Sequence, residues 1–231
     1  MKKLTFFILI ALIMSAFTYK PKRIVFIGDS ITDGNWGNSK YWNQPCDQRD
    51  QNDMNHIYGH GFMYITASRM QAENPDDYLF FNRGISGNRL CDIALRWNND
   101  LINLQPDEIH ILVGVNDLIQ SDVADTIKWE NTYDSLISIT KTKFPDIKII
   151  IGQPFCFPGH WFKDFQRKKL ECESLSRIAE RVARKHKACF VKYWDMLKKL
   201  EASNPEKYIW DGVHPTPAGH YKMAELLKKQ I

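Results

Sequence analysis

The stretch RIVFIGDS, residues 23–30, decides the fold class of this chain. Its first part, Arg23–Ile27, is a run of apolar and β-branched side chains that ends at Gly28. Such a run is typical of a strand buried on both faces of a parallel sheet, whereas a surface strand alternates apolar and polar residues. We therefore expect a buried strand here, with the polar Asp29 and Ser30 directly after its carboxyl end.

Short apolar runs alternate with segments of helical spacing along the rest of the chain. We expect further strands at 78–81, 108–113, 148–151 and 189–193, and helices at 56–73, 89–104, 126–144, 161–186 and 218–229. The connecting segments contain helices of ten or more residues, which is enough to return the chain parallel to the preceding strand with right-handed connectivity. The pattern predicts an α/β fold whose ligands bind at the carboxyl ends of the strands.

The composition is that of an ordinary globular domain. The 231 residues are 44% hydrophobic and 25% charged, and a chain of this length buries enough surface to fold without metal or disulfides. The net charge of +4 is small, and the locally basic stretch 163–192 is typical of a solvated helix face. We therefore expect no nucleic acid partner.

The N-terminus has the pattern of a secretory signal. Lys2 and Lys3 precede an apolar run over residues 4–17, which is followed by polar residues. That run is shorter than the roughly 20 residues that cross a bilayer. We expect a signal peptide over residues 1–18, a domain over 19–231, export to the periplasm or the outside of the cell, and no stable membrane insertion after cleavage. An uncleaved membrane anchor is the alternative.

Neither the cysteines nor the histidines have the spacing of a metal site. The five cysteines match no zinc-binding motif, and their odd number leaves at least one thiol unpaired in an exported protein without deciding whether any disulfide forms. His56 and His60 are four residues apart, but no Glu follows His56 as in the HExxH motif. We expect neither a metal nor another cofactor.

Four short motifs fall after predicted strands or just before the last predicted helix. They are GDSI at 28–31, NRGISG at 82–87, GVND at 114–117 and DGVH at 211–214. Together they resemble the GDSL or SGNH hydrolases, and the match covers nearly the whole chain outside the predicted signal. The resemblance implies a serine esterase with a flavodoxin-like, three-layer α/β/α sandwich and a mostly parallel five-stranded sheet.

The motif residues also form a consistent catalytic set on chemical grounds. A serine hydroxyl needs a neighbouring base to act as a nucleophile, and an imidazole base needs a carboxylate to orient it. We therefore predict Ser30 as nucleophile, His214 as base and Asp211 as the orienting carboxylate. The alternative for Ser30 is a helix cap. For Asp29, beside it, we expect hydrogen bonds to backbone amides that shape the turn.

Ester hydrolysis also needs donors for the oxyanion that forms during attack. The family resemblance implies that Ser30 and Gly87 supply backbone amides and that Asn116 supplies its side-chain amide. The alternatives are that Gly87 serves a tight backbone turn and that Asn116 caps a loop.

The substrate is suggested by aromatic residues in the predicted loops. Residues 32–55 form a long polar loop in this prediction, and tryptophans there and near the other motifs could stack on sugar rings. We expect substrate contacts from Trp36, Trp42, Trp161 and Trp210, unless some of them merely pack the loops.

The predicted function is the removal of small O-acyl groups, such as acetyl, from a carbohydrate ester through an acyl-serine intermediate. One alternative is a lipid-directed esterase or lysophospholipase of the same family, in which the aromatic residues would hold an acyl chain. The other is a glycan-binding domain without catalysis, against which the complete Ser, His and Asp set argues.

Overall fold

Five parallel strands form the sheet of the protein, whose computed structural model describes residues 20–231. The strand order is β2-β1-β3-β4-β5, and each neighbouring pair is parallel. The strands are β1 (Lys22–Gly28), β2 (Tyr78–Gly84), β3 (Glu108–Leu112), β4 (Lys148–Gly152) and β5 (Cys189–Val191). The predicted α/β fold is confirmed, while the predicted signal peptide lies outside the described residues.

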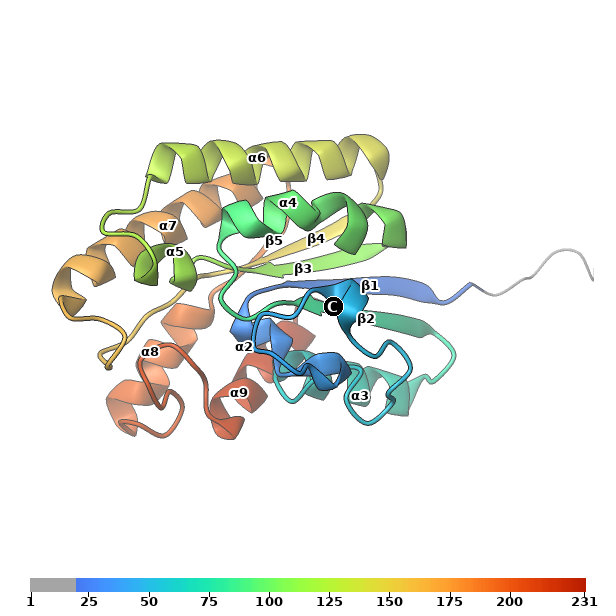
Figure 1. The fold of residues 1–231 in the computed structure, drawn as a ribbon, viewed down its shortest axis with the longest axis horizontal. Coiled ribbons are helices and arrows are strands. Elements are labelled where there is room, and N and C mark those ends of the chain that lie inside the picture. The colour runs from blue at the N-terminus through green and yellow to red at the C-terminus, as the bar shows by residue number, and fades with distance from the viewer. Residues whose placement is uncertain (1–19) are drawn as a thin grey trace, which may run out of the picture.

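Helices cover both faces of the sheet, which gives the three layers visible in Figure 1. One layer holds α4 (Leu90–Asp100), α5 (Val115–Ile119), α6 (Thr126–Lys143) and α7 (Phe165–Lys185). The other holds α2 (Ser30–Asp33), α3 (Phe62–Glu73), α8 (Tyr193–Ser203) and α9 (Pro217–Lys228). The three-layer sandwich that the resemblance implies is therefore present.

Strand β1 lies inside the sheet between β2 and β3, and this explains its apolar sequence. Its four residues Ile24–Ile27 have no exposed surface. Successive side chains of a strand point to opposite faces, so both helical layers pack against β1. On one face Phe26 contacts Phe62 of α3, with ring centroids 5.8 Å apart. This buried strand fixes the position of Ser30, which begins α2 two residues after β1 ends.

Two helices begin several residues later than the sequence predicts. The predicted helix at 56–73 begins only at Phe62, because residues 56–61 bond to the preceding loop: His60 N donates to Gly34 O at 2.9 Å, and Gly59 has a φ of +70°. The predicted helix at 161–186 begins at Phe165, where the Asp164 side chain accepts a hydrogen bond from Arg167 N.

Helix α8 was not predicted. Its segment follows β5, which ends at Val191 rather than at 193 as expected. The buried residues Tyr193, Trp194 and Leu197 have helical spacing, and that spacing was the available signal. Within residues 20–231, no helix is both long and apolar enough to cross a membrane.

Candidate active site

The four motifs meet at the carboxyl edge of the sheet, around one pocket of about 540 Å³. Ser30 begins α2 after β1, Gly87 lies in the turn after β2, and Asn116 lies in α5 after β3. His214 comes from the turn before α9. These four residues all line the pocket, so the structure brings together side chains that are up to 184 residues apart.

Ser30, His214 and Asp211 form a continuous line of hydrogen bonds. Ser30 Oγ lies 2.8 Å from His214 Nε2. The other ring nitrogen, His214 Nδ1, lies 2.6 Å from Asp211 Oδ2. A hydroxyl bonded to an imidazole that is in turn bonded to a carboxylate can act as a nucleophile at neutral pH. The predicted catalytic residues therefore have the geometry that their predicted roles require.

A tight turn holds Asp211 and His214 in this arrangement. Asp211 Oδ1 accepts hydrogen bonds from the backbone N–H groups of Val213, at 3.0 Å, and His214, at 2.7 Å. Between them, Gly212 has a φ of +98°, and an added Cβ would lie 2.8 Å from Phe157 O. Glycine is needed here because an L side chain is both strained and blocked at this position.

Asp211 is placed to stay ionised. Burial raises its pKa, but hydrogen bonds from the His214 ring and backbone, from the Trp161 side chain and from Val213 N outweigh burial and hold the pKa below its usual value. An ionised carboxylate stabilises the imidazolium that forms when His214 accepts a proton.

Asp29 has the structural role that the sequence predicts. Its side chain accepts a hydrogen bond from Ile31 N at 3.0 Å and is the N-cap of α2. Burial raises the pKa of Asp29 to about 7, and the nearby Asp117 and Asp33 also raise it. Since Asp29 caps the helix and the Ser30 hydroxyl contacts His214, the alternative assignment of Ser30 as a helix cap is wrong.

Gly87 and Asn116 are placed as candidate oxyanion donors beside Ser30. Gly87 adopts a φ of +82°, and its carbonyl accepts a hydrogen bond from the Gln120 side chain at 2.6 Å. Asn116 Nδ2 donates one hydrogen bond to Asn88 O at 3.1 Å, and an amide carries a second N–H. Asn116 therefore both braces the loop and keeps a donor for a ligand in the pocket.

Replacing Gly87 with Ala should lower kcat by up to about 10²-fold, because the backbone N–H is kept but is displaced from the position in which it can bind the oxyanion. A Cβ at this position would overlap the six-membered ring of Trp42 and would be strained at a positive φ. Steady-state kinetics on an acetyl ester would measure the loss.

The matched controls are Trp42→Ala alone and the double variant Gly87→Ala with Trp42→Ala. Removing the indole relieves the overlap but leaves the backbone strain in place. Partial recovery in the double variant would assign the loss to the overlap. A single Gly87→Ala variant with the kcat of the unmodified protein would show that the overlap and the backbone strain do not displace this N–H, and would contradict the need for glycine at this position.

Three of the four predicted substrate-binding tryptophans lie at the pocket. Trp42 and Trp161 line it. Trp210 stacks on the His214 ring, with centroids 6.2 Å apart, and is 65% exposed.

The prediction for Trp36 is wrong. Trp36 has no exposed surface and packs with Cys46 and Ile85 in a small separate core. Its Nε1 donates to Gly84 O at 2.9 Å, and the guanidinium groups of Arg49 and Arg83 lie 4.8 and 5.0 Å from the centre of its ring. Trp36 thus packs the long loop and does not reach the pocket.

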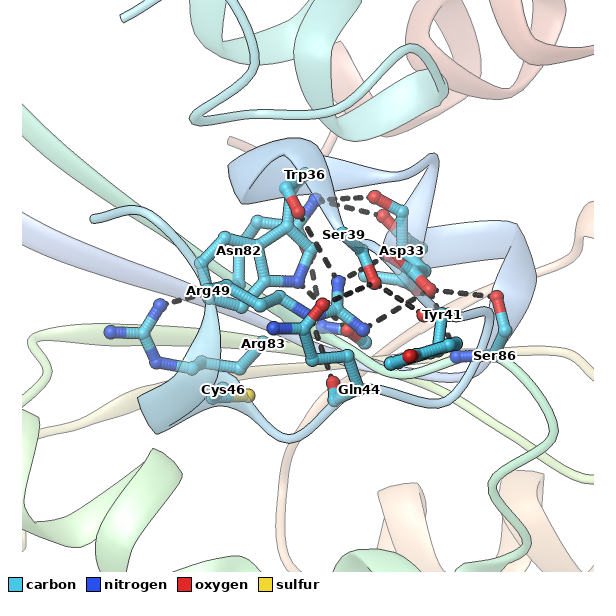
Figure 2. Close-up of polar contacts among 12 residues, drawn as sticks. Asp33, Trp36, Ser39, Tyr41, Gln44, Cys46, Arg49, Asn82, Arg83 and Ser86 are labelled. Atoms are coloured by element: carbon cyan, nitrogen blue, oxygen red, sulfur yellow. Dashed lines mark hydrogen bonds and ion pairs between the residues drawn. The ribbon is translucent and has the colours of Figure 1, made fainter. Parts of the chain in front are cut away.

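A buried ion pair, which the sequence did not reveal, ties three segments of the site together (Figure 2). Asp33 of α2 and Arg49 of the long loop approach to 2.6 Å, and both side chains are almost wholly buried. Asp33 Oδ2 also accepts hydrogen bonds from Ser86 N at 2.9 Å and Ser86 Oγ at 2.7 Å. The segment that carries the nucleophile, the loop that carries Trp42 and the turn that carries Gly87 thus share one carboxylate.

The two histidines with helical metal spacing contact each other, and one of them also contacts a carboxylate. His56 Nδ1 lies 2.8 Å from Asp53 Oδ2, and the His56 ring packs edge-on against His60. Over residues 20–231 no three His, Cys, Asp or Glu side chains are grouped to hold a metal ion.

Comparison with known proteins finds an esterase that is similar over nearly the whole chain. An acetylxylan esterase from Geobacillus stearothermophilus is 29% identical over 233 aligned positions, which cover 91% of this chain and 94% of that protein. Its crystal structure has a TM-score of 0.73 at 26% identity and covers 90% of this chain and 93% of that one. Two further structures of it are described as catalytic mutants, one of a serine and one of an aspartate.

A second solved structure is also similar, that of a Parabacteroides merdae protein assigned as a GDSL-like lipase. It has a TM-score of 0.78 at 28% identity and covers 91% of this chain and 95% of that one. Residues 26–222 of this chain match the GDSL-like Lipase/Acylhydrolase family, a stretch that contains all four motifs. The resemblance drawn from the motifs is confirmed: the chain belongs to the GDSL-like lipase/acylhydrolase family.

Proposed function

We propose that the protein is a serine esterase that hydrolyses carboxylic esters through an acyl-Ser30 intermediate. The observation that carries the proposal is the hydrogen-bonded line from Ser30 through His214 to Asp211, which opens into a pocket with candidate oxyanion donors.

In the proposed reaction, these groups act in a fixed order. Ser30 Oγ attacks the ester carbonyl carbon while its proton passes to His214 Nε2. The charge on the carbonyl oxygen is bound by the N–H groups of Ser30 and Gly87 and by Asn116 Nδ2. His214 gives the proton to the leaving alcohol, and water then hydrolyses the acyl-serine by the same proton transfers.

We further propose that the substrate is a carbohydrate that carries small O-acyl groups such as acetyl. Trp42 and Trp161 line the pocket, and the exposed indole of Trp210 lies beside His214, where aromatic faces can stack on sugar rings. The pocket volume of about 540 Å³ is in the range of small-molecule sites. The similarity to an acetylxylan esterase supports the same class. We also propose that the enzyme acts after export, on the strength of its N-terminal signal pattern.

A lipid-directed esterase is the second candidate, because apolar side chains line much of the pocket. Val115, Ile119 and Val213 lie there beside the tryptophans and could hold an acyl chain.

The test compares chromogenic esters from acetyl to octanoyl with acetylated xylooligosaccharides and a lysophospholipid, with Ser30→Ala as the blank. Acetyl preference together with acetate release from the oligosaccharide supports the carbohydrate proposal. Preference for octanoyl and lysophospholipid would replace it with the lipid candidate. Wild-type activity equal to that of the blank on every ester would overturn the esterase proposal.

The role of Trp210 can be separated in the same experiment. Trp210→Ala removes the exposed ring, whereas Trp210→Phe keeps an aromatic face. If the ring stacks on sugar, Ala raises KM for the oligosaccharide more than Phe does, and neither changes KM for the chromogenic acetate to the same extent.

A further inference from the structure

Trp161 makes a contact with the catalytic set that stacking on a substrate does not require. Its indole Nε1 donates a hydrogen bond to Asp211 Oδ2 at 2.9 Å. The same oxygen lies 2.6 Å from His214 Nδ1. Two N–H donors thus meet on one carboxylate oxygen, and one of them belongs to a residue outside the four motifs.

The segment that carries Trp161 is held against the turn of Asp211. Phe157 N donates to Gly212 O at 2.8 Å, and Phe162 N donates to Gly159 O at 3.2 Å. A Cβ at Gly159 would collide with the backbone of Asp211 and would lie 2.7 Å from Gly212 Cα. The two backbones therefore touch with no side chain between them, and this fixes the position of the indole N–H relative to the carboxylate.

The hydrogen bond acts on a carboxylate that water does not reach. The Asp211 side chain is 1% exposed. Its Oδ1 accepts hydrogen bonds from Val213 N and His214 N. The other oxygen, Oδ2, is hydrogen-bonded to His214 Nδ1 and Trp161 Nε1. A donor on Oδ2 draws charge from that oxygen, and less charge then remains to stabilise the imidazolium form of His214.

We propose that Trp161 is a positioning residue for the Asp211 and His214 pair. Its indole N–H holds Oδ2 in line with His214 Nδ1 and sets the pH below which His214 becomes protonated and inactive as a base. The proposal rests on the proposed esterase function, since it gives Trp161 a part in the same reaction.

Among the groups around His214, Asp211 is the one through which the Trp161 N–H affects the protonation of the His214 ring. The polar and titratable groups around the ring are Asp211 on its own turn, the Ser30 hydroxyl on α2 and His220 on α9, with His160 packed behind Trp161. Burial, together with a smaller effect of His214, lowers the pKa of His220 to about 4, so His220 stays neutral between pH 5 and 8. A shift in the titration of His214 in that range would therefore report on its bond to Asp211.

The experiment compares Trp161→Phe with Trp210→Phe in the full-length protein. Both variants lose an indole N–H beside His214 and keep an aromatic ring, but of the two indoles it is that of Trp161 which donates to Asp211. Two readouts are taken: the pH dependence of kcat/KM on a chromogenic acetyl ester, and the titration of the His214 ring by NMR.

We expect Trp161→Phe to move both midpoints upward by about 0.5 pH unit, a fraction of the strength of a charged hydrogen bond. The kcat should fall by about threefold to tenfold, and KM for the small ester should stay within about twofold, because the indole N–H faces the carboxylate and not the ester. Trp210→Phe should leave both midpoints in place, whatever its effect on the rate.

Midpoints of Trp161→Phe that coincide with those of the unmodified protein would overturn the proposal, as would an equal shift in Trp210→Phe. Trp161 is 43% exposed, which favours folding of the variant, and Trp161→Tyr tests the same loss of the indole N–H if the Phe variant is unstable. The NMR titration needs no turnover. Absence of ester hydrolysis in the unmodified protein would therefore count against the proposed function, and the NMR midpoints would still decide the role of Trp161.

Discussion

Replacing Ser30 with Ala should lower kcat/KM for acetyl esters by at least about 10⁴-fold, since the attacking atom itself is removed. Of the other residues around the pocket, Ser86 also carries a hydroxyl, but that group is bonded to the buried Asp33 at 2.7 Å. The Ser86 hydroxyl is therefore not expected to replace Ser30 Oγ as the nucleophile.

Ser86→Ala is the matched control for this prediction, because it removes a hydroxyl from the same pocket and keeps the Ser86 N–H bond to Asp33. We expect its kcat/KM to stay within about tenfold of the unmodified protein. A second measurement uses an electrophilic phosphonate, followed by mass spectrometry of the labelled peptide. An adduct on the peptide of Ser30, lost in Ser30→Ala, would support the nucleophile. Ser30→Ala turnover comparable to that of the unmodified protein would contradict it.

Replacing Asp211 with Asn should lower kcat/KM by about 10³-fold or more. The amide can present an N–H to His214 Nδ1, which favours the ring tautomer whose Nε2 carries the proton and cannot accept one from Ser30. It also removes the negative charge that stabilises the imidazolium. The expected change lies mainly in kcat, because Asp211 is almost wholly buried and does not line the pocket.

Kinetics at several pH values, with thermal unfolding of the same samples, would check this prediction. The Asn side chain can still accept hydrogen bonds from Val213 N and His214 N, so the turn is expected to remain folded. Asp195→Asn changes a carboxylate on α8, outside the pocket, and serves as the control. A loss of less than about tenfold in Asp211→Asn would contradict the role of this carboxylate.

The sequence predicted the sheet well because the rule that governs it is local. Ile24–Ile27 are apolar since both faces of β1 are buried, and the same reasoning found the other strands. The site was predictable for a related reason. Parallel strands bring their carboxyl ends to one edge, so motifs that follow β1, β2 and β3 had to lie close together.

The contacts that the sequence did not predict all depend on how the loops fold. Trp36 and Trp42 are both tryptophans in the same polar loop sequence, yet Trp36 is buried in a small core and Trp42 lines the pocket. Likewise, nothing in the spacing of Asp33 and Arg49 shows that they pair, or that the indole of Trp161 reaches Asp211. Such contacts depend on how irregular backbone turns fold. A single sequence shows the periodic patterns of helices and strands, and these turns have no periodic pattern.

The carboxylate of Asp33, which three segments share, limits which loops of related esterases can replace the long loop of this protein. A chimaera that received residues 34–61 from another esterase without an equivalent of Arg49 would leave the Asp33 charge buried without its partner, at a cost of about 3 to 5 kcal/mol. Arg49 and Asp33 must therefore be kept or exchanged as a pair. The loop around Trp42 can be redesigned to alter the substrate range, provided that both residues of the pair are transferred together.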